Sequence, residues 1–361
     1  MSKNVNADLA LKLRLRRILF AEGYWSPIEV ELSHYEASGS GVKRSSLTDL
    51  DVLGIRYDRL FSVRRIVGDC KTGKHVSDAN RLFWLRGVMD YFGADQAYFL
   101  RPKIEAHSRA VAPKMNLRVF DETDLLALEK TLQVDRLPFP LADPAVYSTI
   151  EDLWGLRVTK GKQPTEEQLK LKPLYSYLTY SFWYFERHRN LFALIDHFQR
   201  RASLLAPNDV RHVLLAFTGA ERFALSLLEV ANHVQAQGGS DIPRHARNYL
   251  FGGTLALKDK EQFFELLRKV TGVSESLDPP TMPEILELLN RLLRNPIGAS
   301  DILRHISVAY LWCTHLGNAN LPTFTGDTPN TAAVVLAKDV CLTFAKVTGL
   351  SEALFESIRS L

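Results

Sequence analysis

The stretches TDLDVLG, residues 48–54, and GDCKT, residues 68–72, decide the fold of the first part of the chain. In each, charged residues stand two apart between apolar or small ones. Residues i and i+2 of a β-strand share a face, so Asp49 is predicted to point with Asp51, and Asp69 with Lys71, while Cys70 faces the other way. Two carboxylates and an ammonium group on adjacent strands are costly to desolvate. The pattern therefore predicts a site that holds a divalent metal ion and activates water beside a phosphodiester.

The composition is that of a globular protein with more than one domain. The chain has 361 residues, of which 46% are hydrophobic and 24% charged, and this length predicts two domains, or three. No apolar run approaches the ~20 residues that span a membrane, and the first residues lack the apolar core of a signal peptide. Three scattered cysteines predict neither a disulfide framework nor a zinc site. We therefore expect a cytoplasmic protein without a membrane partner.

The basic excess is confined to the part of the chain that contains these acidic and basic stretches. Residues 1–130 contain 21 basic and 17 acidic side chains, whereas residues 131–361 contain 24 of each. A local excess of positive charge is compatible with a polyanionic partner. Nucleic acid is thus the partner expected for the first part of the chain.

The order of predicted elements indicates an α/β domain. Helical spacing predicts a helix over 7–22, and alternation predicts strands over 28–32, 49–57 and 61–70, with a Gly/Ser-rich loop over 37–46. Further helices are expected over 77–92, 104–115 and 122–132, with strands over 96–100 and 117–120. The first three strands suit an antiparallel meander, and the later ones should add in parallel through helical crossovers. We predict a mixed sheet flanked by helices.

Helical periodicity dominates after about residue 135. Pro138, Pro140 and Pro144 predict a linker, and Pro279-Pro280 marks a later break. Helices are predicted over 174–206, 210–235, 258–270, 283–293, 300–315 and 331–348. The predicted organisation is an α/β domain over 1–135 followed by an all-α domain over 136–361.

Residues 7–130 resemble the PD-(D/E)xK, or restriction-endonuclease-like, nuclease superfamily, with the closest likeness to its Mrr-like branch. The motifs that carry the resemblance are a leading helix ending at Gly23-Tyr24, the strand Leu50-Asp51-Val52, and Asp69-x-Lys71 on the next strand. A strand, a helix, a strand and an acidic helix start at Asp121-Glu122 then follow. The resemblance implies a mixed-sheet nuclease fold.

Roles for single residues follow from this resemblance. It implies that Asp51 and Asp69 bind Mg²⁺ or Mn²⁺, and that Lys71 positions the attacking water or helps to deprotonate it. Asp49 is an expected auxiliary ligand. Many members place an acid in the first helix, where this chain has basic residues, so Glu29 or Glu31 is expected to supply that carboxylate.

Three basic residues are candidates for contact with phosphates. Lys43 and Arg44 lie in the predicted loop over 37–46, and Lys74 lies in the turn that follows the Asp69-x-Lys71 strand. Basic side chains contact the nucleic-acid backbone without reading its sequence.

Two other interpretations of the same residues remain open. The acids and Lys71 could form an ordinary structural ion-pair cluster. Alternatively, residues 68–75, GDCKTGKH, nearly match the phosphate-binding loop G-x-x-x-x-G-K-[ST]. In that motif His75 stands where the Mg²⁺-binding hydroxyl belongs, and Asp69 places a negative charge in an anion site.

The sequence thus predicts a Mg²⁺-dependent endonuclease that hydrolyses phosphodiester bonds, in DNA rather than RNA, in prokaryotic defence or DNA processing. The all-α domain is expected to recognise the target or a partner, as a homodimer or as a subunit of a complex. The alternative is a catalytically inactive scaffold that retains the nuclease fold and binds a larger complex.

Overall fold

The computed structural model describes residues 3–38, 41–73, 77–137, 141, 163–238, 240–272, 276–316 and 330–359. Contacts divide these residues into two compact units. The sheet unit contains the described residues of 1–57 and 63–153, and the helical unit contains those of 58–62, 154–310 and 330–361. Residues 311–316, at the end of a helix that begins in the helical unit, group with the sheet unit. The linker predicted at Pro138, Pro140 and Pro144 lies outside the described residues, so the domain boundary at residue 135 stays a prediction.

Five strands form one mixed sheet in sequence order: β1 (Ile28–Ser38), β2 (Gly41–Tyr57), β3 (Val63–Cys70), β4 (Gln96–Leu100) and β5 (Leu117–Phe120). The first three strands pair antiparallel, and β4 and β5 add in parallel. The predicted meander followed by parallel crossovers is confirmed. β4 is buried over four of its five residues, as expected for a strand covered on both faces, whereas only Leu117 is buried in the edge strand β5.

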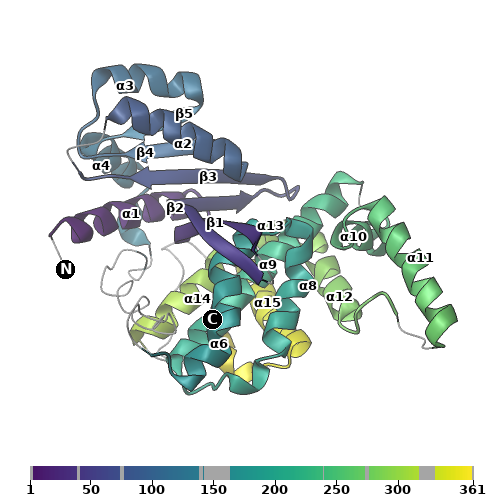
Figure 1. Cartoon of the computed structure of the whole chain (residues 1–361). Helices are drawn as coiled ribbons and strands as arrows, with labels where there is room; N and C mark the ends of the chain where they lie inside the picture. Colours follow the sequence, from purple (N-terminus) through teal and green to yellow (C-terminus); the bar gives the residue numbers. More distant parts are fainter. Residues whose placement is uncertain are drawn as a thin grey trace. The chain divides into compact units, whose positions relative to one another are not determined.

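Helices cover both faces of this sheet. The sheet unit contains α1 (Lys3–Ala21), α2 (Asp78–Phe92), α3 (Ala106–Val111) and α4 (Glu122–Thr131). Figure 1 shows α1 on one side of the sheet, and α2 and α3 on the other. Side chains cap two of these helices, Ser77 at the start of α2 and Asp121 in a capping box at the start of α4.

In the core between α1 and the sheet, Leu15 of α1 packs directly against Gly68 of β3, where any larger residue would clash. A methyl group on Gly68 would lie 2.4 Å from Leu15 Cδ2. Leu15, Val52 and Cys70 belong to the same buried cluster. Because side chains alternate along a strand, burying Cys70 against α1 turns Asp69 and Lys71 toward the face that carries α2.

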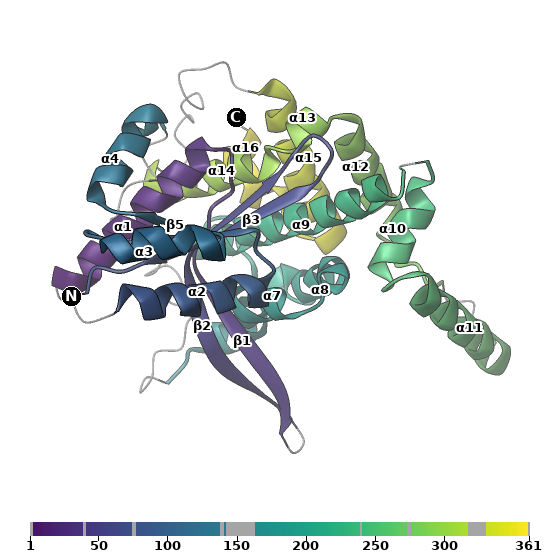
Figure 2. The same ribbon diagram turned by 90° about the horizontal axis from the view of Figure 1, so that it is seen from above.

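The predicted loop over 37–46 is wrong for most of its length. β1 continues to Ser38 and β2 begins at Gly41, and pairing runs out to Ser38↔Gly41. The register shifts once, between Leu32 and Ser33. Figure 2 shows the two strands as a long ribbon extending beyond the rest of the sheet. The small polar residues lack an apolar alternation, but the ladder of backbone hydrogen bonds extends through them regardless.

The second unit is helical, as predicted for this part of the chain. Its main helices are α6 (Glu166–Ser176), α7 (Phe182–Tyr184), α8 (Arg187–Gln199), α9 (Val210–Ala236), α10 (Ile242–Leu250), α11 (Thr254–Thr271), α12 (Met282–Arg294), α13 (Pro296–Ala299), α14 (Ile302–Leu316), α15 (Thr331–Thr348) and α16 (Glu356–Arg359). No helix in the described parts of the chain is both long enough and apolar enough to cross a membrane.

The single helix predicted over 174–206 is interrupted. A π-helical turn over Tyr177–Ser181 follows α6, and Phe185 between α7 and α8 has extended backbone. Asn190 Nδ2 donates to the Phe182 carbonyl at 2.9 Å, which satisfies a group that loses its helical partner at this break. The prediction also missed α10.

Substituting Gly68→Ala tests the approach of α1 to the sheet. The added methyl group overlaps Leu15, so we expect a loss of about 1–3 kcal/mol in the free energy of unfolding, measured by urea denaturation. Gly87→Ala in α2 is the matched control, because nothing lies within 4 Å of its added methyl group, and it should be neutral or stabilising by up to ~1 kcal/mol. Equal effects of the two substitutions would contradict the packing described.

Candidate active site

The candidate site lies where the sheet forks between β2 and β3. The two strands pair from Tyr57↔Val63 to Val52↔Gly68, and beyond that point β2 continues with β1 while β3 continues with β4. At the fork the Cys70 amide donates to Asp51 Oδ2 at 2.7 Å. A side-chain oxygen thus receives the hydrogen bond that a neighbouring strand would otherwise accept.

The fork brings together the three residues predicted to carry the chemistry. Lys71 Nζ lies 3.0 Å from Asp51 Oδ2 and 3.3 Å from Asp69 Oδ1. Both aspartates are only 3% exposed, whereas the Lys71 side chain is 31% exposed. The predicted juxtaposition of two acids and one amine is confirmed. Lys71 is the most exposed of the three side chains.

Two further cations complete this cluster. Lys12 Nζ, from α1, lies 2.9 Å from Asp51 Oδ1. Arg81, from α2, makes two hydrogen bonds of 2.6 Å, one to each oxygen of Asp69. The Arg81 guanidinium also lies 3.5 Å from the centre of the Trp84 ring, which fixes its plane. Each aspartate is therefore held by cations from two different elements.

Glu29 joins the cluster, and the other auxiliary acids are placed away from it. Glu29 Oε1 accepts from Lys12 at 3.0 Å. Glu31 pairs with Arg44 and lies opposite Asp49 in the β1–β2 register. Asp49 is exposed, and no contact between it and Asp51, Asp69 or Lys71 is found in the structure. Of the expected auxiliary ligands, Glu29 alone reaches Lys12 among the described contacts.

The basic residues expected to contact phosphates lie elsewhere. Lys43 and Arg44 are in the paired part of β2, not in a loop, where Lys43 Nζ lies 3.7 Å from Glu36 and Arg44 contacts Glu31 and Ser33. Lys74 lies outside the described residues. The described acidic partners of Lys43 and Arg44 are Glu36 and Glu31, which differ from the acids that Lys71 contacts.

The pKa directions favour the charged forms of Asp51, Lys12 and Lys71, whereas burial raises the pKa of Asp69 against the opposing effects of Arg81 and Lys71. Burial acts to raise the pKa of Asp51, but Lys12 and Lys71 outweigh it and lower the pKa below the ordinary value. Burial acts to lower the pKa of Lys71, but Asp69 and Asp51 raise it overall. The pKa of Lys12 is raised for the same reason, against its burial, by Asp51 and Glu29. At neutral pH the cluster thus contains an ionised Asp51 and two ammonium groups.

Hydrogen bonds and an ion pair outside the cluster fix the positions of α1 and α2, the helices that contribute Lys12 and Arg81. The Asp8 carboxylate, one helical turn before Lys12, accepts from the Thr72 amide at 3.0 Å and from the Thr72 hydroxyl. Asp78, at the first position of α2, is 1% exposed and pairs with Arg101. These contacts tie both helices that supply cations to the loops flanking the fork.

The phosphate-binding-loop interpretation of residues 68–75 does not fit the strand geometry. Gly68 lies within β3, opposite Val52 on one side and Tyr98 on the other. A residue in the middle of a sheet cannot wrap around a phosphate. Asp69 is bound by Arg81. Lys74 and His75, which would carry the rest of the motif, lie outside the described residues.

A separate group in the helical unit has metal-ligand types of side chain. Ligand atoms of Glu167, Asp209 and His212 all lie within 4.8 Å of one another. Arg211, however, contacts both acids, Asp209 at 2.5 Å and Glu167 at 3.1 Å. His212 Nδ1 accepts from the Ala206 amide, so the neutral ring carries its proton on Nε2, which faces Glu167. Internal ion pairing accounts for this group.

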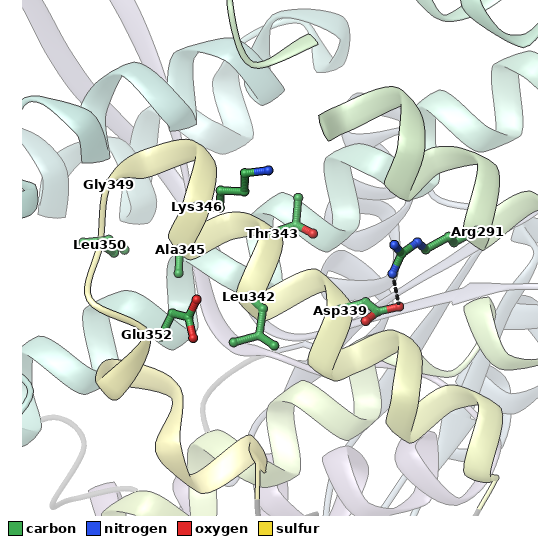
Figure 3. Close-up of a pocket in the computed structure, with 9 residues that line it drawn as sticks. All are labelled: Arg291, Asp339, Leu342, Thr343, Ala345, Lys346, Gly349, Leu350 and Glu352. Atoms are coloured by element: carbon green, nitrogen blue, oxygen red, sulfur yellow. Dashed lines mark hydrogen bonds and ion pairs between the residues drawn. The ribbon is translucent and has the colours of Figure 1, made fainter. Parts of the chain in front are cut away.

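A shallow hollow of about 410 Å³ lies between α12, α15 and the turn after α15. Figure 3 shows Arg291 of α12 reaching Asp339 of α15 at one side of the hollow, and their ion pair measures 3.1 Å. Lys346 pairs with Glu284 at 3.2 Å. The basic groups of this hollow are held by acidic neighbours, and it contains no residue predicted to be functional.

Sequence reasoning missed Lys12 and Arg81. Arg81 has a recognisable signal, because it stands three residues before Trp84 on the helix that follows the Asp69-x-Lys71 strand. That spacing places the two side chains on one helix face. Lys12 lies in a helix whose basic residues point in several directions, so its role depends on where α1 packs.

Replacing Asp51 tests the electrostatic role of this carboxylate. Asp51→Asn removes the buried carboxylate that Lys12 and Lys71 share and leaves each ammonium group with one acid, Glu29 or Asp69, so we expect a loss of about 3 kcal/mol in the free energy of unfolding at neutral pH. Because the folded pKa of Asp51 is lowered, its contribution is present above the unfolded pKa of ~3.9 and is lost as pH falls through the folded value. The difference between the two proteins should shrink on acidification below about pH 4.

Asp49→Asn is the matched control for this measurement, because Asp49 is an exposed aspartate on the same strand. We expect it to change stability by less than about 0.5 kcal/mol. Similar losses from the two substitutions would show that the buried ion pairs of Asp51 add nothing.

Comparisons of the chain with known proteins gave no match. No family model, no curated protein and no solved structure is similar to it. The function proposed for the chain therefore depends on its own residues and their geometry.

Proposed function

We propose that the sheet unit is a nuclease domain that uses Mg²⁺ or Mn²⁺ to hydrolyse phosphodiester bonds, with DNA as the preferred substrate. The observation that carries the proposal is the position of Lys71 Nζ, within 3.3 Å of one oxygen of each buried aspartate at the fork. A single cation at that position contacts both acids. The restriction-endonuclease-like nuclease fold is part of the same proposal.

The donor set fits a hard divalent cation. Such ions bind carboxylate oxygens at about 2.0–2.6 Å, and Asp51 and Asp69 would provide them. The Lys71 side chain is 31% exposed and follows the last residue of β3, so its ammonium group can move toward solvent. A bound metal would polarise the phosphodiester and stabilise the charge that develops on its oxygens.

Once a divalent ion is bound, the charge of the cluster would favour an anionic ligand. Asp51, Asp69 and Glu29 are matched by Lys12, Lys71 and Arg81, so their formal charges cancel. A divalent ion would add two positive charges. A phosphodiester carries one negative charge per phosphate, so metal and substrate should bind more tightly together than separately.

Lys71 is proposed to act as a protonated hydrogen-bond donor and not as a general base. Its pKa is raised by Asp69 and Asp51 against the effect of burial. A protonated amine can orient a water molecule or a phosphate oxygen and stabilise negative charge, but it cannot deprotonate water. Of the two roles expected for this residue, positioning is the one that its charge state favours.

One observation favours the second candidate, an inactive nuclease-fold scaffold. Arg81 contacts both oxygens of Asp69 at 2.6 Å, so a metal at Asp69 would share its ligand with a guanidinium group. In a scaffold the acids and bases at the fork would be structural ion pairs. The two candidates differ in whether the wild-type chain binds a divalent metal, which calorimetry measures directly.

The helical unit is proposed to recognise the target or a partner. Cutting both strands of a duplex requires two active sites, and a symmetric dimer of this chain would supply them. Several large apolar side chains on α11 are exposed, namely Leu255, Phe263, Leu266 and Val270. Clustered apolar surface is typical of interaction sites. A cytoplasmic role in prokaryotic defence or DNA processing completes the proposal.

The nuclease proposal predicts that purified protein nicks or cuts DNA when Mg²⁺ or Mn²⁺ is added and is inactive with a chelator. Asp51→Asn, Asp69→Asn and Lys71→Gln should each lower the cleavage rate at least 100-fold, because oriented charge at a reacting phosphate contributes about that much or more. Gel analysis of a supercoiled plasmid measures both nicking and cutting.

Asp49→Asn is the control for this assay and should retain cleavage, because Asp49 is exposed outside the cluster. Circular dichroism spectra should match the wild type for every variant. Full activity of the Lys71→Gln protein would refute the role given to this side chain. Absence of both cleavage and metal binding in the wild type would favour the scaffold.

A further inference from the structure

Two cations flank Asp51, one on each side of its carboxylate. Lys71 Nζ contacts Oδ2 at 3.0 Å and also reaches Asp69. Lys12 Nζ contacts Oδ1 at 2.9 Å and also contacts Glu29 at 3.0 Å. The cluster therefore contains two positions at which one cation bridges a pair of acids, and Asp51 is common to both.

We infer that Lys12 permanently occupies the second of these cation positions, so that the chain binds a single divalent ion at this site. The inference deepens the proposed nuclease function and depends on it. It assigns the divalent ion to the acids Asp51 and Asp69, and the covalently tethered ammonium group of Lys12 to Asp51 and Glu29.

The two lysines differ in how firmly they are held. Lys12 lies in the interior of α1, a helix of 19 residues, and its side chain is 11% exposed. Lys71 follows the last residue of β3 and is 31% exposed. An incoming metal can displace the lysine at the strand end, whereas displacing Lys12 would force its charge into the packed interface of α1.

The backbone of β1 is shaped to present Glu29 at the second position. Ile28 lies opposite Val52 and Val30 opposite Leu50, which places Glu29 beside Asp51. Glu29 has a φ of 55°, a left-handed conformation that residues other than glycine rarely adopt. A strained residue that completes a charge cluster indicates that the surrounding contacts hold it there.

Lys12 contacts the Asp51 oxygen that receives fewer hydrogen bonds, Oδ1. Asp51 Oδ1 is buried and accepts no hydrogen bond of normal geometry from the described residues, although Lys12 lies 2.9 Å away. Asp51 Oδ2, by contrast, accepts from the Cys70 amide and from Lys71. Removing the Lys12 charge should therefore open a second place for a metal ion on Oδ1.

The experiment measures the number of Mn²⁺ ions bound per chain, by calorimetry and by the electron paramagnetic resonance signal of free Mn²⁺, with the full chain and no nucleic acid. The wild type should bind one ion. Lys12→Gln should bind two, because the second ion would take the place of the Lys12 ammonium group between Asp51 and Glu29. The double variant Lys12→Gln/Glu29→Gln should return to one.

Arg14→Gln is the matched control. Arg14 lies in the same helix and also pairs with two acids, Glu122 and Glu129, away from the fork. This variant should bind one ion, as the wild type does. Its thermal unfolding, compared with that of Lys12→Gln, shows whether loss of an ion-paired basic residue from α1 alters folding in general.

Each outcome separates this inference from the proposed function. Two ions on the wild type would overturn the inference and leave the nuclease proposal intact. One ion on Lys12→Gln would also overturn it, since Lys12 would then mask no cation position. No ion on the wild type would refute the metal-dependent function itself. If Lys12→Gln does not fold, the wild-type count alone decides, with one ion in support and two against.

Discussion

Asp51, which is 3% exposed, is held at the fork of the sheet by the Cys70 amide of β3 and by two ammonium groups, those of Lys12 in α1 and of Lys71 just after β3. A buried carboxylate is stable only when its charge is compensated from close range. The positions of α1, of the end of β3 and of the residues that follow it are thus coupled through one side chain. The Cys70 amide, Lys12 and Lys71 meet at Asp51 because α1 packs against the sheet where β2 and β3 separate.

The packing of α1 makes this convergence possible. Gly68 leaves room for Leu15, which brings α1 close to the sheet, and Lys12 lies nearly one turn earlier on the same helix. Asp8 then fixes the start of α1 to Thr72, next to Lys71. Close apolar packing and the charge cluster therefore support each other, because a shift of the helix would disturb both.

The two aspartates of the cluster are more deeply buried than two of the cations that contact them. Both aspartates are 3% exposed, whereas the side chains of Lys71 and Arg81 are 31% and 21% exposed, so a phosphate approaching the fork would meet these two cations first. This order suits a site whose substrate is an anion and whose metal lies beneath it. It also explains why the same residues could serve as structural ion pairs if no metal binds.

The sequence by itself determined the order of the strands, the parallel crossovers, and the faces of Asp51, Asp69 and Lys71, because strand alternation and helix periodicity are local patterns. It also predicted β4 and β5 to the residue. The tertiary structure alone decided the length of the β1–β2 ribbon, the fork between β2 and β3, and the arrival of Lys12 and Arg81 at the acids. These depend on how distant segments pack and on where backbone pairing ends. The spacing of Arg81 and Trp84 places both on one helix face, but no spacing along the chain shows that this face reaches Asp69 or that Lys12 reaches Asp51.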